Sequence, residues 1–355
     1  MAKVRILAID GGGVRGIIPA TILAYLENKL IERTGNDKTR IHNFLDFASG
    51  TSTGAIISAL AITPAEEGKP PMKMEKVVNL YFELAADVFK KDRKRNLKTL
   101  WGLLGPKYSA KPIDDILIKK LDHWRLNELV LPCAFTGYDT AKRRPIIYTN
   151  RDDKEKYGNY FIKDVVRGST AIPSAFAPAY FRNGVDVNTL IDGGVFANNP
   201  SLVAYIEMLK TKEITDKFVK TKEGAQVNQL NPTNVIVLSL GTGRGTLTTY
   251  PNDKIKKWGM IKWFGPVLNI LLQGMGDVTA YEMNKLFEVW NASDNYIRIN
   301  PDIKIGSANG QDASASNMRH LHQDALNYIS DNKEFLDNLA ERLIKEDLRY
   351  ASFLF

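Results

Sequence analysis

Apolar positions along the chain alternate between short unbroken runs and longer stretches with helical spacing. Residues 4–9 are apolar at nearly every position, which is typical of a strand buried on both faces of a parallel sheet. After the glycine-rich stretch 11–16, apolar residues recur at helical spacing until Gly35. A second unit of strand, turn and helix covers residues 44–62 and stops before Pro64. The chain therefore begins with two strand–turn–helix units.

The same alternation continues through the rest of the chain. We predict strands at 133–138, 146–148, 190–191, 235–240 and 296–299, and helices at 73–90, 112–120, 201–213, 277–290, 313–328 and 332–347. Strands that alternate with helices predict an α/β fold of three layers, α/β/α, with a mostly parallel central sheet. The polar stretch 211–233 is interpreted as a surface excursion, so we expect one domain over residues 1–355.

The composition is that of a globular protein and excludes several classes. The chain has 355 residues, of which 44% are hydrophobic and 25% charged, and its 26 Gly and 15 Pro follow no fixed period. These values exclude a disordered chain, a collagen and a repeat solenoid. The single cysteine, Cys133, excludes a disulfide framework and favours the cytoplasm. No apolar run reaches the roughly 18 residues of a membrane span, so we expect peripheral contact at the inner face of a membrane.

The net charge of +8 is concentrated in two segments. Residues 86–112 hold eight Lys and Arg against two Asp, and residues 251–275 hold four Lys against one Asp. Both segments also carry tryptophan and leucine, so we interpret them as lid or membrane-facing insertions. A solvated helix face and a buried core helix remain alternatives. No recognised module accompanies the charge, so we expect no nucleic acid polymer as a partner.

Ser52 is a candidate nucleophile because of the turn in which it lies. The pattern Gly50-Thr51-Ser52-Thr53-Gly54 stands between a predicted strand at 44–48 and a predicted helix at 55–62. In this context a G-x-S-x-G pattern predicts a nucleophile elbow, in which Gly50 and Gly54 permit close approach of strand and helix. The alternative is a chance turn rich in Gly and Ser.

A serine hydroxyl needs a base, and two kinds of residue compete for that role. His320 and His322 follow Ser52 in the chain, but they lie in a predicted helix, which favours ordinary surface histidines. Asp192 ends a predicted strand and is followed by Gly193 and Gly194, so its carboxylate is expected at the edge of a parallel sheet where active sites collect. With an ordinary pKa near ~3.9 it is a poor base unless burial raises that value.

The stretch DGGGVRG (10–16) is a candidate anion site, because successive N–H groups lie at a helix N-terminus. It matches G-x-G-x-x-G, so a nucleotide-binding module with an incidental Ser52 remains a rival interpretation. That interpretation needs an acid at the tip of the second strand, whereas Asp46 lies inside it. The other use is to hold the oxyanion of an acyl-transfer intermediate. A catalytically silent membrane-binding protein is a third alternative.

Five ordered motifs resemble the patatin-like phospholipases. They are DGGGVRG, GTSTG, STAIPSAFAPAYF (169–181), DGGVFANNP (192–200) and LSLGTG, which ends at Gly243. The resemblance spans at least residues 4–243, and YIRINP (296–301) is similar to the family's C-terminal part. One small departure is Ala55, where family members often carry a second Gly after the elbow.

The resemblance implies a Ser-Asp dyad without histidine. Ser52 would be the nucleophile and Asp192 the base, with Asn198 and Asn199 holding the Asp loop. The implied oxyanion hole comprises Gly11, Gly12, Gly13, Arg15 and Gly16, in which Arg15 supports the loop. Neither a metal nor a cofactor is implied.

The implied activity is that of a phospholipase A or lysophospholipase, which releases fatty acids from membrane phospholipids through an acyl-enzyme. A neutral-lipid esterase is the alternative. The chain also resembles compact bacterial members of the family that serve as antiphage effectors switched on by cyclic nucleotides. A cyclic di- or trinucleotide activator is therefore a hypothesis, and the oligomeric state is left open.

Overall fold

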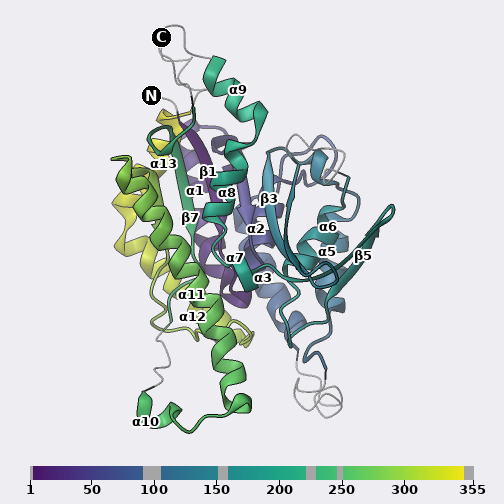
Figure 1. Ribbon diagram of the computed structural model, residues 1–355. Helices are drawn as coiled ribbons and strands as arrows, with labels where there is room; N and C mark the ends of the chain where they lie inside the picture. Colours follow the sequence, from purple (N-terminus) through teal and green to yellow (C-terminus); the bar gives the residue numbers. More distant parts are fainter. Residues whose placement is uncertain (1–2, 91–104, 151–158, 221–228, 246–250, 348–355) are drawn as a thin grey trace.

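A mostly parallel sheet lies between two layers of helices (Figure 1). The computed structural model describes residues 3–90, 105–150, 159–220, 229–245 and 251–347. Its eight-stranded sheet has the order β5-β6-β3-β2-β1-β7-β8, with β4 paired to β3. The strands are β1 (Val4–Ile9), β2 (Phe47–Gly50), β3 (Cys133–Asp139), β4 (Arg144–Thr149), β5 (Ala179–Asn183), β6 (Asp186–Asp192), β7 (Val235–Leu240) and β8 (Tyr296–Ile299).

Five adjacent strands, β3, β2, β1, β7 and β8, run in one direction and end at one edge, here called the carboxyl edge. β1 pairs in parallel with β2 and β7, β2 with β3, and β7 with β8. In this register Ile9 lies opposite both Gly50 and Leu240. The loops that follow these strands therefore meet at the carboxyl edge, and the opposite edge is called the amino edge.

The strand that carries Asp192 differs from the prediction in length and direction. β6 begins at Asp186 and pairs antiparallel with β3, with Gly137 opposite Asp192. Its first four residues, Asp186 to Thr189, include three polar ones, which is why the apolar pattern revealed only residues 190–191. Asp192 still reaches the carboxyl edge, because β3 extends past the level of Gly50 and β6 runs back along that extension.

The sequence of β1 explains why the sheet is covered on both faces. Val4, Ile6 and Ala8 pack into one apolar cluster, while Leu7 and Ile9 pack into another on the opposite face. The second cluster contains residues of α1 (Ile17–Thr34), α2 (Thr53–Ile62), α3 (Met74–Val88), α5 (Lys111–Leu121), α6 (Ile162–Ser169), α12 (Ala315–Asp331) and α13 (Lys333–Lys345). The first contains residues of α8 (Ser201–Leu209), α9 (Lys212–Lys220) and α11 (Met260–Val289). This arrangement confirms the three-layer prediction.

Two predicted segments are helical over a greater length than the sequence indicated. The surface excursion at 211–233 includes α9, and the helix expected at 277–290 begins at Met260 as α11. Pro266 lies inside α11, so the proline did not mark a helix boundary here. α10 (Asn252–Ile255) precedes it. Within the described ranges, no helix combines the length and apolar character needed to cross a bilayer.

The other basic segment, 86–112, lies largely outside the described residues. Lys91, Arg93, Lys94, Arg95, Lys98 and Trp101 fall in the range 91–104, which the structure does not describe. The interpretation of this segment as a lid or membrane-facing insertion therefore stays a prediction.

A buried charge cluster joins the amino edge to the end of the last helix. Arg5 of β1 donates from Nε to Asp46 Oδ2 at 2.9 Å, and its Nη1 lies 2.7 Å from Asp347 Oδ2. All three side chains are buried. Since a buried charge requires a partner, the N-terminal strand and the segment after α13 stabilise each other.

Candidate active site

Ser52 occupies a sharp turn between β2 and α2. Its backbone has φ 55° and ψ −122°, a conformation that is costly for a residue with a side chain and common at functional sites. The Ser52 N–H donates to Ser169 Oγ at 2.9 Å. Gly54 lies against the backbone of Ile9, where a Cβ would collide with the Ile9 carbonyl oxygen. The expected strand–turn–helix context is present, and the glycine is required for close approach.

Asp192 lies next to Ser52 and is buried, with 3% of its surface exposed. Its Oδ1 accepts a hydrogen bond of 2.7 Å from the Gly194 N–H. Hydrogen bonding from the Ser52 hydroxyl lowers the pKa of the carboxyl group, although Oδ2 has no partner at full hydrogen-bond geometry among the described residues. One oxygen is thus held in place and the other is available to accept a proton.

Burial raises the pKa of Asp192 to about 7 despite the opposing effects of the Ser52 hydroxyl and the Gly194 N–H. Removal from water disfavours the charged form of a carboxyl group. A group with this pKa can accept a proton from a hydroxyl more readily than an ordinary carboxylate can. Burial therefore makes Asp192 a stronger base than an ordinary aspartate.

The glycine turn at 10–16 lies against the elbow, because a Cβ placed on Gly11 would lie 3.2 Å from Ser52 Cβ. The Gly11 N–H donates to Asn198 O at 3.0 Å and the Val14 N–H to Gly310 O at 2.9 Å. Because the Gly11 N–H already donates to Asn198 O, it is not free to bind an anion at the predicted anion site. The N–H groups of Gly12 and Gly13 lack a hydrogen-bond partner in the described part of the chain.

Gly13 and Gly16 have distinct structural roles in this turn. Gly13 has φ +60°, and a Cβ there would collide with Gly310 O. Gly16 faces Thr53 and Tyr81, whose hydroxyls hydrogen-bond to each other, so a side chain at this position would collide with them. The place of Gly16 in the oxyanion hole stays a prediction.

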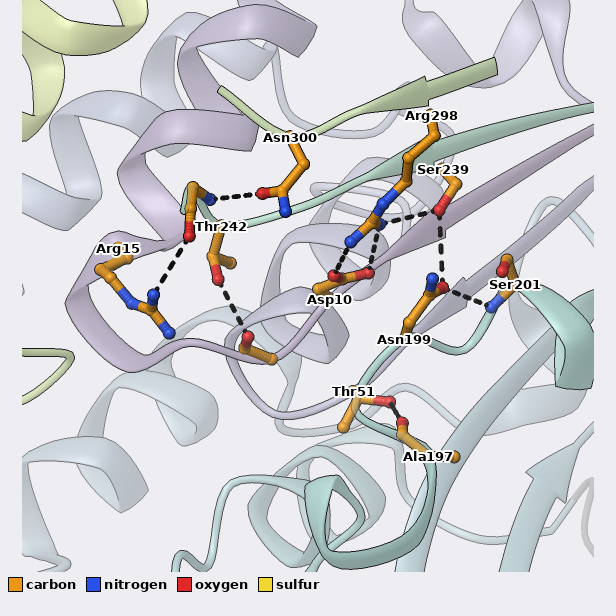
Figure 2. A network of polar contacts seen from close by, with 12 residues as sticks. Asp10, Arg15, Thr51, Ala197, Asn199, Ser201, Ser239, Thr242, Arg298 and Asn300 are labelled. Atoms are coloured by element: carbon orange, nitrogen blue, oxygen red, sulfur yellow. Dashed lines mark hydrogen bonds and ion pairs between the residues drawn. The ribbon is translucent and has the colours of Figure 1, made fainter. Parts of the chain in front are cut away.

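Arg15 and Thr242 tie the glycine turn to the loop after β7 (Figure 2). Arg15 donates from Nε to Gly12 O at 3.3 Å and from Nη1 to Gly243 O at 3.2 Å. Thr242 Oγ1 donates to Gly11 O at 3.0 Å. Both side chains hold backbone carbonyls, which fixes the direction of the peptide units. Arg15 therefore connects the glycine turn to the loop after β7.

Arg298 of β8 links the glycine turn to the Asp192 loop, a role that the sequence analysis missed. Its Nη1 lies 2.8 Å from Asp10 Oδ1 and 2.9 Å from Ser239 Oγ, and its Nη2 lies 2.5 Å from Asp10 Oδ2. Ser239 Oγ in turn donates to Asn199 Oδ1 at 3.5 Å (Figure 2). The only signal in the sequence was a single arginine in the apolar segment YIRINP.

Further contacts hold the Asp192 loop against the elbow. Thr51 Oγ1 donates to Ala197 O at 2.7 Å and lies 2.8 Å from Thr136 Oγ1. Asn199 Oδ1 accepts from the Ser201 N–H at 3.0 Å (Figure 2). Asn198 contributes its backbone carbonyl to Gly11, as noted above. Both asparagines therefore hold the loop, which agrees with the role expected for them.

An apolar pocket adjoins Ser52 on the α3 and α5 side. Its lining includes Gly13, Val14, Ser52, Thr53, Ile56, Leu80, Tyr81, Ala85, Val88, Phe89, Ile113, Ile116, Leu117, Thr170, Ile172 and Phe176. Twelve of these sixteen residues have aliphatic or aromatic side chains, which suits a hydrocarbon chain and not a nucleotide phosphate. The glycine turn thus opens onto apolar surroundings, which weighs against the nucleotide-binding alternative.

Neither a histidine nor a metal cluster takes part in this site within the described residues. His320 is exposed on α12, and His322 stacks edge-to-face on Phe82 with ring centroids 5.4 Å apart. The pocket next to Ser52 includes no histidine, and the described chain holds no group of three or more residues suited to a metal ion. The histidine triad is therefore disfavoured by position.

Comparison with known proteins identifies the family. The family model for "Patatin-like phospholipase" matches residues 7–205. The chain belongs to the patatin-like phospholipase family. Patatin-like protein 2 of Oryza sativa subsp. indica is 32% identical over 336 residues, which cover 90% of this chain and 82% of that protein. Patatin-T5 of Solanum tuberosum is 29% identical over 330 residues, with the same coverage of 90% and 82%.

Membership of the patatin-like phospholipases makes the protein a lipid acyl hydrolase, that is, a carboxylic ester hydrolase. The crystal structure of VipD from Legionella pneumophila overlaps with a TM-score of 0.39 at 14% identity, covering 93% of this chain and 67% of that one. Overlap at this level carries no argument about activity.

Proposed function

We propose that the protein is a serine acyl hydrolase in which Ser52 and Asp192 form the catalytic dyad. The observation that carries this proposal is the buried carboxyl group of Asp192, whose pKa is raised to about 7 and whose Oδ2 lacks a full partner beside the Ser52 hydroxyl. The strained backbone at Ser52 supports the same assignment, because such strain persists only where the surrounding structure enforces it.

In the acylation step, Ser52 Oγ bonds to the ester carbonyl carbon as its proton passes to Asp192 Oδ2. The carbonyl electron pair moves onto oxygen, and the N–H groups of Gly12 and Gly13 stabilise that oxyanion. When the oxyanion collapses, the alcohol leaves with the proton from Asp192, and the acyl group stays on Ser52.

Deacylation uses the same residues with water as the nucleophile. Asp192 takes a proton from water as the water oxygen bonds to the acyl carbon, and the second oxyanion forms at the same N–H groups. Its collapse breaks the bond to Ser52 Oγ, which regains the proton from Asp192, and a fatty acid is released. Both steps conserve protons and charge.

We propose membrane phospholipids as the substrates. The aliphatic lining next to Ser52 suits an acyl chain, and a lysophospholipid would leave as the alcohol in the first step. A neutral-lipid ester would place its acyl chain in the same pocket. Phospholipids and neutral-lipid esters differ in the headgroup and not in the acyl chain. The acyl pocket therefore does not distinguish them, and an activity assay on both is needed.

The test measures fatty-acid release from phospholipid vesicles by the wild type and by Ser52→Ala. Ser58→Ala is the matched control, because Ser58 is a buried serine of α2, the helix that follows Ser52, and its hydroxyl donates to Ser49 O. We expect a loss of at least about 10⁴-fold in Ser52→Ala and little change in Ser58→Ala. Release that persists in Ser52→Ala would contradict the dyad, and faster release from triacylglycerol emulsions would favour the neutral-lipid substrate.

A separate arm of this assay adds cyclic di- and trinucleotides. The motivation is the resemblance in layout to nucleotide-switched effectors together with the basic segments of the chain. A nucleotide-dependent rise in fatty-acid release that Ser52→Ala lacks would support a cyclic nucleotide as activator. Equal release with and without every nucleotide would remove this proposal and leave the hydrolase assignment intact.

A further inference from the structure

We propose that residues 251–271, which comprise α10 and the first part of α11, form an arm that docks on an anionic lipid bilayer. The inference deepens the proposed function, since it names the surface from which a lipid substrate would enter. Docking itself requires no chemistry at Ser52, so the two proposals can fail separately.

The first argument is the position of the arm. The far part of α11 packs in the core through Met283 and Phe287, and Leu272 lies against Gly194, two residues after Asp192. On the N-terminal side of Leu272 the helix extends away from the body of the molecule. Figure 1 shows this part of α11 projecting, with α10 at its far end. At 1.5 Å per residue, residues 260–271 span about 18 Å. The arm thus extends from the same edge of the sheet that carries Ser52 and Asp192.

The second argument is the apolar surface that the arm exposes. Val267, Ile270 and Leu271 have 40%, 46% and 52% of their surface exposed, and Met260 has 87%. The spacing of the first three places them on neighbouring turns of one helix face. Apolar side chains gathered on a projecting element mark a surface that gains free energy when it leaves water.

The same arm also carries exposed positive charge and tryptophan. Lys254, Lys256, Lys257 and Lys262 are exposed, and Asp253 is the single acidic residue between 251 and 271. Trp258 and Trp263 pack edge-to-face with ring centroids 5.3 Å apart. Lysine and tryptophan around an apolar helix face are typical of elements that lie in the headgroup region of a bilayer.

Charge complementarity selects the bilayer over a second copy of the chain. Two arms that packed on each other would bring two sets of lysines together, with one aspartate each to offset them. Anionic headgroups neutralise the same lysines while the acyl boundary accepts Val267, Ile270 and Leu271. One surface therefore satisfies both the charged and the apolar side chains of the arm.

The first experiment measures flotation of the full chain with vesicles, in a Ser52→Ala background so that no lipid is consumed. We expect binding to vesicles of phosphatidylcholine with phosphatidylglycerol and weak binding to phosphatidylcholine alone. The combined change Lys254→Glu, Lys256→Glu and Lys257→Glu should lower partition at least about ten-fold. The matched control changes Lys38, Lys69 and Lys76 to Glu, which alters net charge equally outside the arm.

The second experiment tests the apolar face with Val267→Ser, Ile270→Ser and Leu271→Ser combined. We expect partition into the anionic vesicles to fall about ten-fold or more, because three exposed aliphatic side chains no longer enter the bilayer. The melting temperature and far-UV circular dichroism of each variant check that the fold is intact. We expect it to be, because the three replaced side chains are already partly exposed to water.

Several results would overturn the proposal. It fails if the wild-type arm gives no preference for anionic vesicles, or if the arm variants and the control variant float equally well. It also fails if sedimentation without vesicles shows a dimer that the combined change Val267→Ser, Ile270→Ser and Leu271→Ser abolishes. The apolar face would then belong to an interface with a second copy of the chain. Loss of the hydrolase assignment in the Ser52→Ala assay would leave these binding results unaffected.

Discussion

At each edge of the sheet an arginine pairs with buried aspartate, yet the two edges differ in what the arginine holds. At the amino edge Arg5 binds Asp46 and Asp347 and thereby joins a strand to the segment after the last helix. At the carboxyl edge Arg298 binds Asp10 in a two-point contact and also reaches Ser239. Arg5 thus holds the segment before β2 and the segment after α13 against β1, whereas Arg298 holds the glycine turn next to Ser52.

This difference teaches where positional accuracy is used. Loops lack the regular hydrogen bonding of strands and helices, so their geometry must be fixed by side chains. At the carboxyl edge Arg15, Thr242 and Arg298 hold the carbonyls and carboxylate of the glycine turn. We therefore expect changes at the amino edge to alter stability alone, and changes at the carboxyl edge to alter turnover as well.

The largest effect on the carboxyl edge is expected from Asp192→Asn. The amide can still accept from the Gly194 N–H but cannot take the Ser52 proton. We expect kcat for a soluble, monomeric ester to fall about 10⁴-fold with little change in KM. Asp46→Asn at the amino edge is the comparison, and there kcat of the folded fraction should be unchanged. Equal losses in the two variants would contradict the contrast between the edges.

The next effect is expected from Gly13→Ala, compared with Gly35→Ala. The two glycines have φ +60° and +62°, but a Cβ would collide with Gly310 O at Gly13 and meets open space at Gly35, where α1 ends. Both variants carry similar backbone strain. Only Gly13→Ala should displace the N–H groups expected to bind the oxyanion, with a loss in kcat of about 10² to 10³-fold. Steady-state kinetics and thermal unfolding separate the two contributions.

A smaller effect is expected when Arg298 or Arg5 is replaced by lysine. Arg298→Lys keeps the charge but cannot hold both oxygens of Asp10 and Ser239 Oγ at once. We expect kcat to fall about 10²-fold, because small displacements of reacting groups are costly, while KM changes little. Arg5→Lys should destabilise the fold about as much as Arg298→Lys does, but it should leave kcat unchanged. An Arg298→Lys enzyme with full kcat at a temperature where it is folded would show that Arg298 is purely structural.

The pH dependence of turnover sharpens the assignment of the base. Because burial raises the pKa of Asp192 to about 7, the proton-accepting form is lost as the pH falls through that value. We expect kcat/KM for a soluble ester to fall about ten-fold per pH unit below 7 and to level off above it. A profile that stays flat down to pH 5 would mean that Asp192 is an ordinary carboxylate or is not the base.

The last expected effect concerns stability and not turnover. The pKa of Asp192 is raised from 3.8 to about 7 on folding, so its contribution to stability is present below pH 4 and is lost as the pH rises through 7. At pH 8 the ionised carboxylate therefore opposes folding by about 4 kcal/mol at most. Asp192→Asn should have a higher melting temperature than the wild type at pH 8, and the difference should shrink at pH 5. A lower melting temperature for Asp192→Asn at pH 8 would contradict this.

The parallel centre of the fold could be predicted from the sequence because burial on both faces leaves an unbroken apolar run. The bounds predicted for β1, β7 and β8 are those of the structure. β2 was predicted at 44–48, but residues 41–44 form a short 3-10 helix and the strand begins at Phe47. Phe44 would be buried in a strand and is buried in the 3-10 helix, so its hydrophobicity could not distinguish the two elements.

Other elements left weaker signals. β5 was missed and β6 shortened, because exposed positions interrupt their apolar pattern. The glycine turn, the elbow and Asp192 could be identified as candidates because special backbone geometry restricts the residue types there. Arg298 could not, since its partner Asp10 is 288 positions away and no local pattern connects them.

The clasp between Arg5 and Asp347 has a consequence for biosynthesis. Arg5 is synthesised before Asp347, one of its two aspartate partners, and the 341 positions between them include Arg298. A nascent chain holding only the glycine turn and the elbow has Asp10 without its arginine, so the loops that would support hydrolysis are not yet fixed. The contacts that fix the glycine turn next to Ser52 therefore form only after Arg298 has been made.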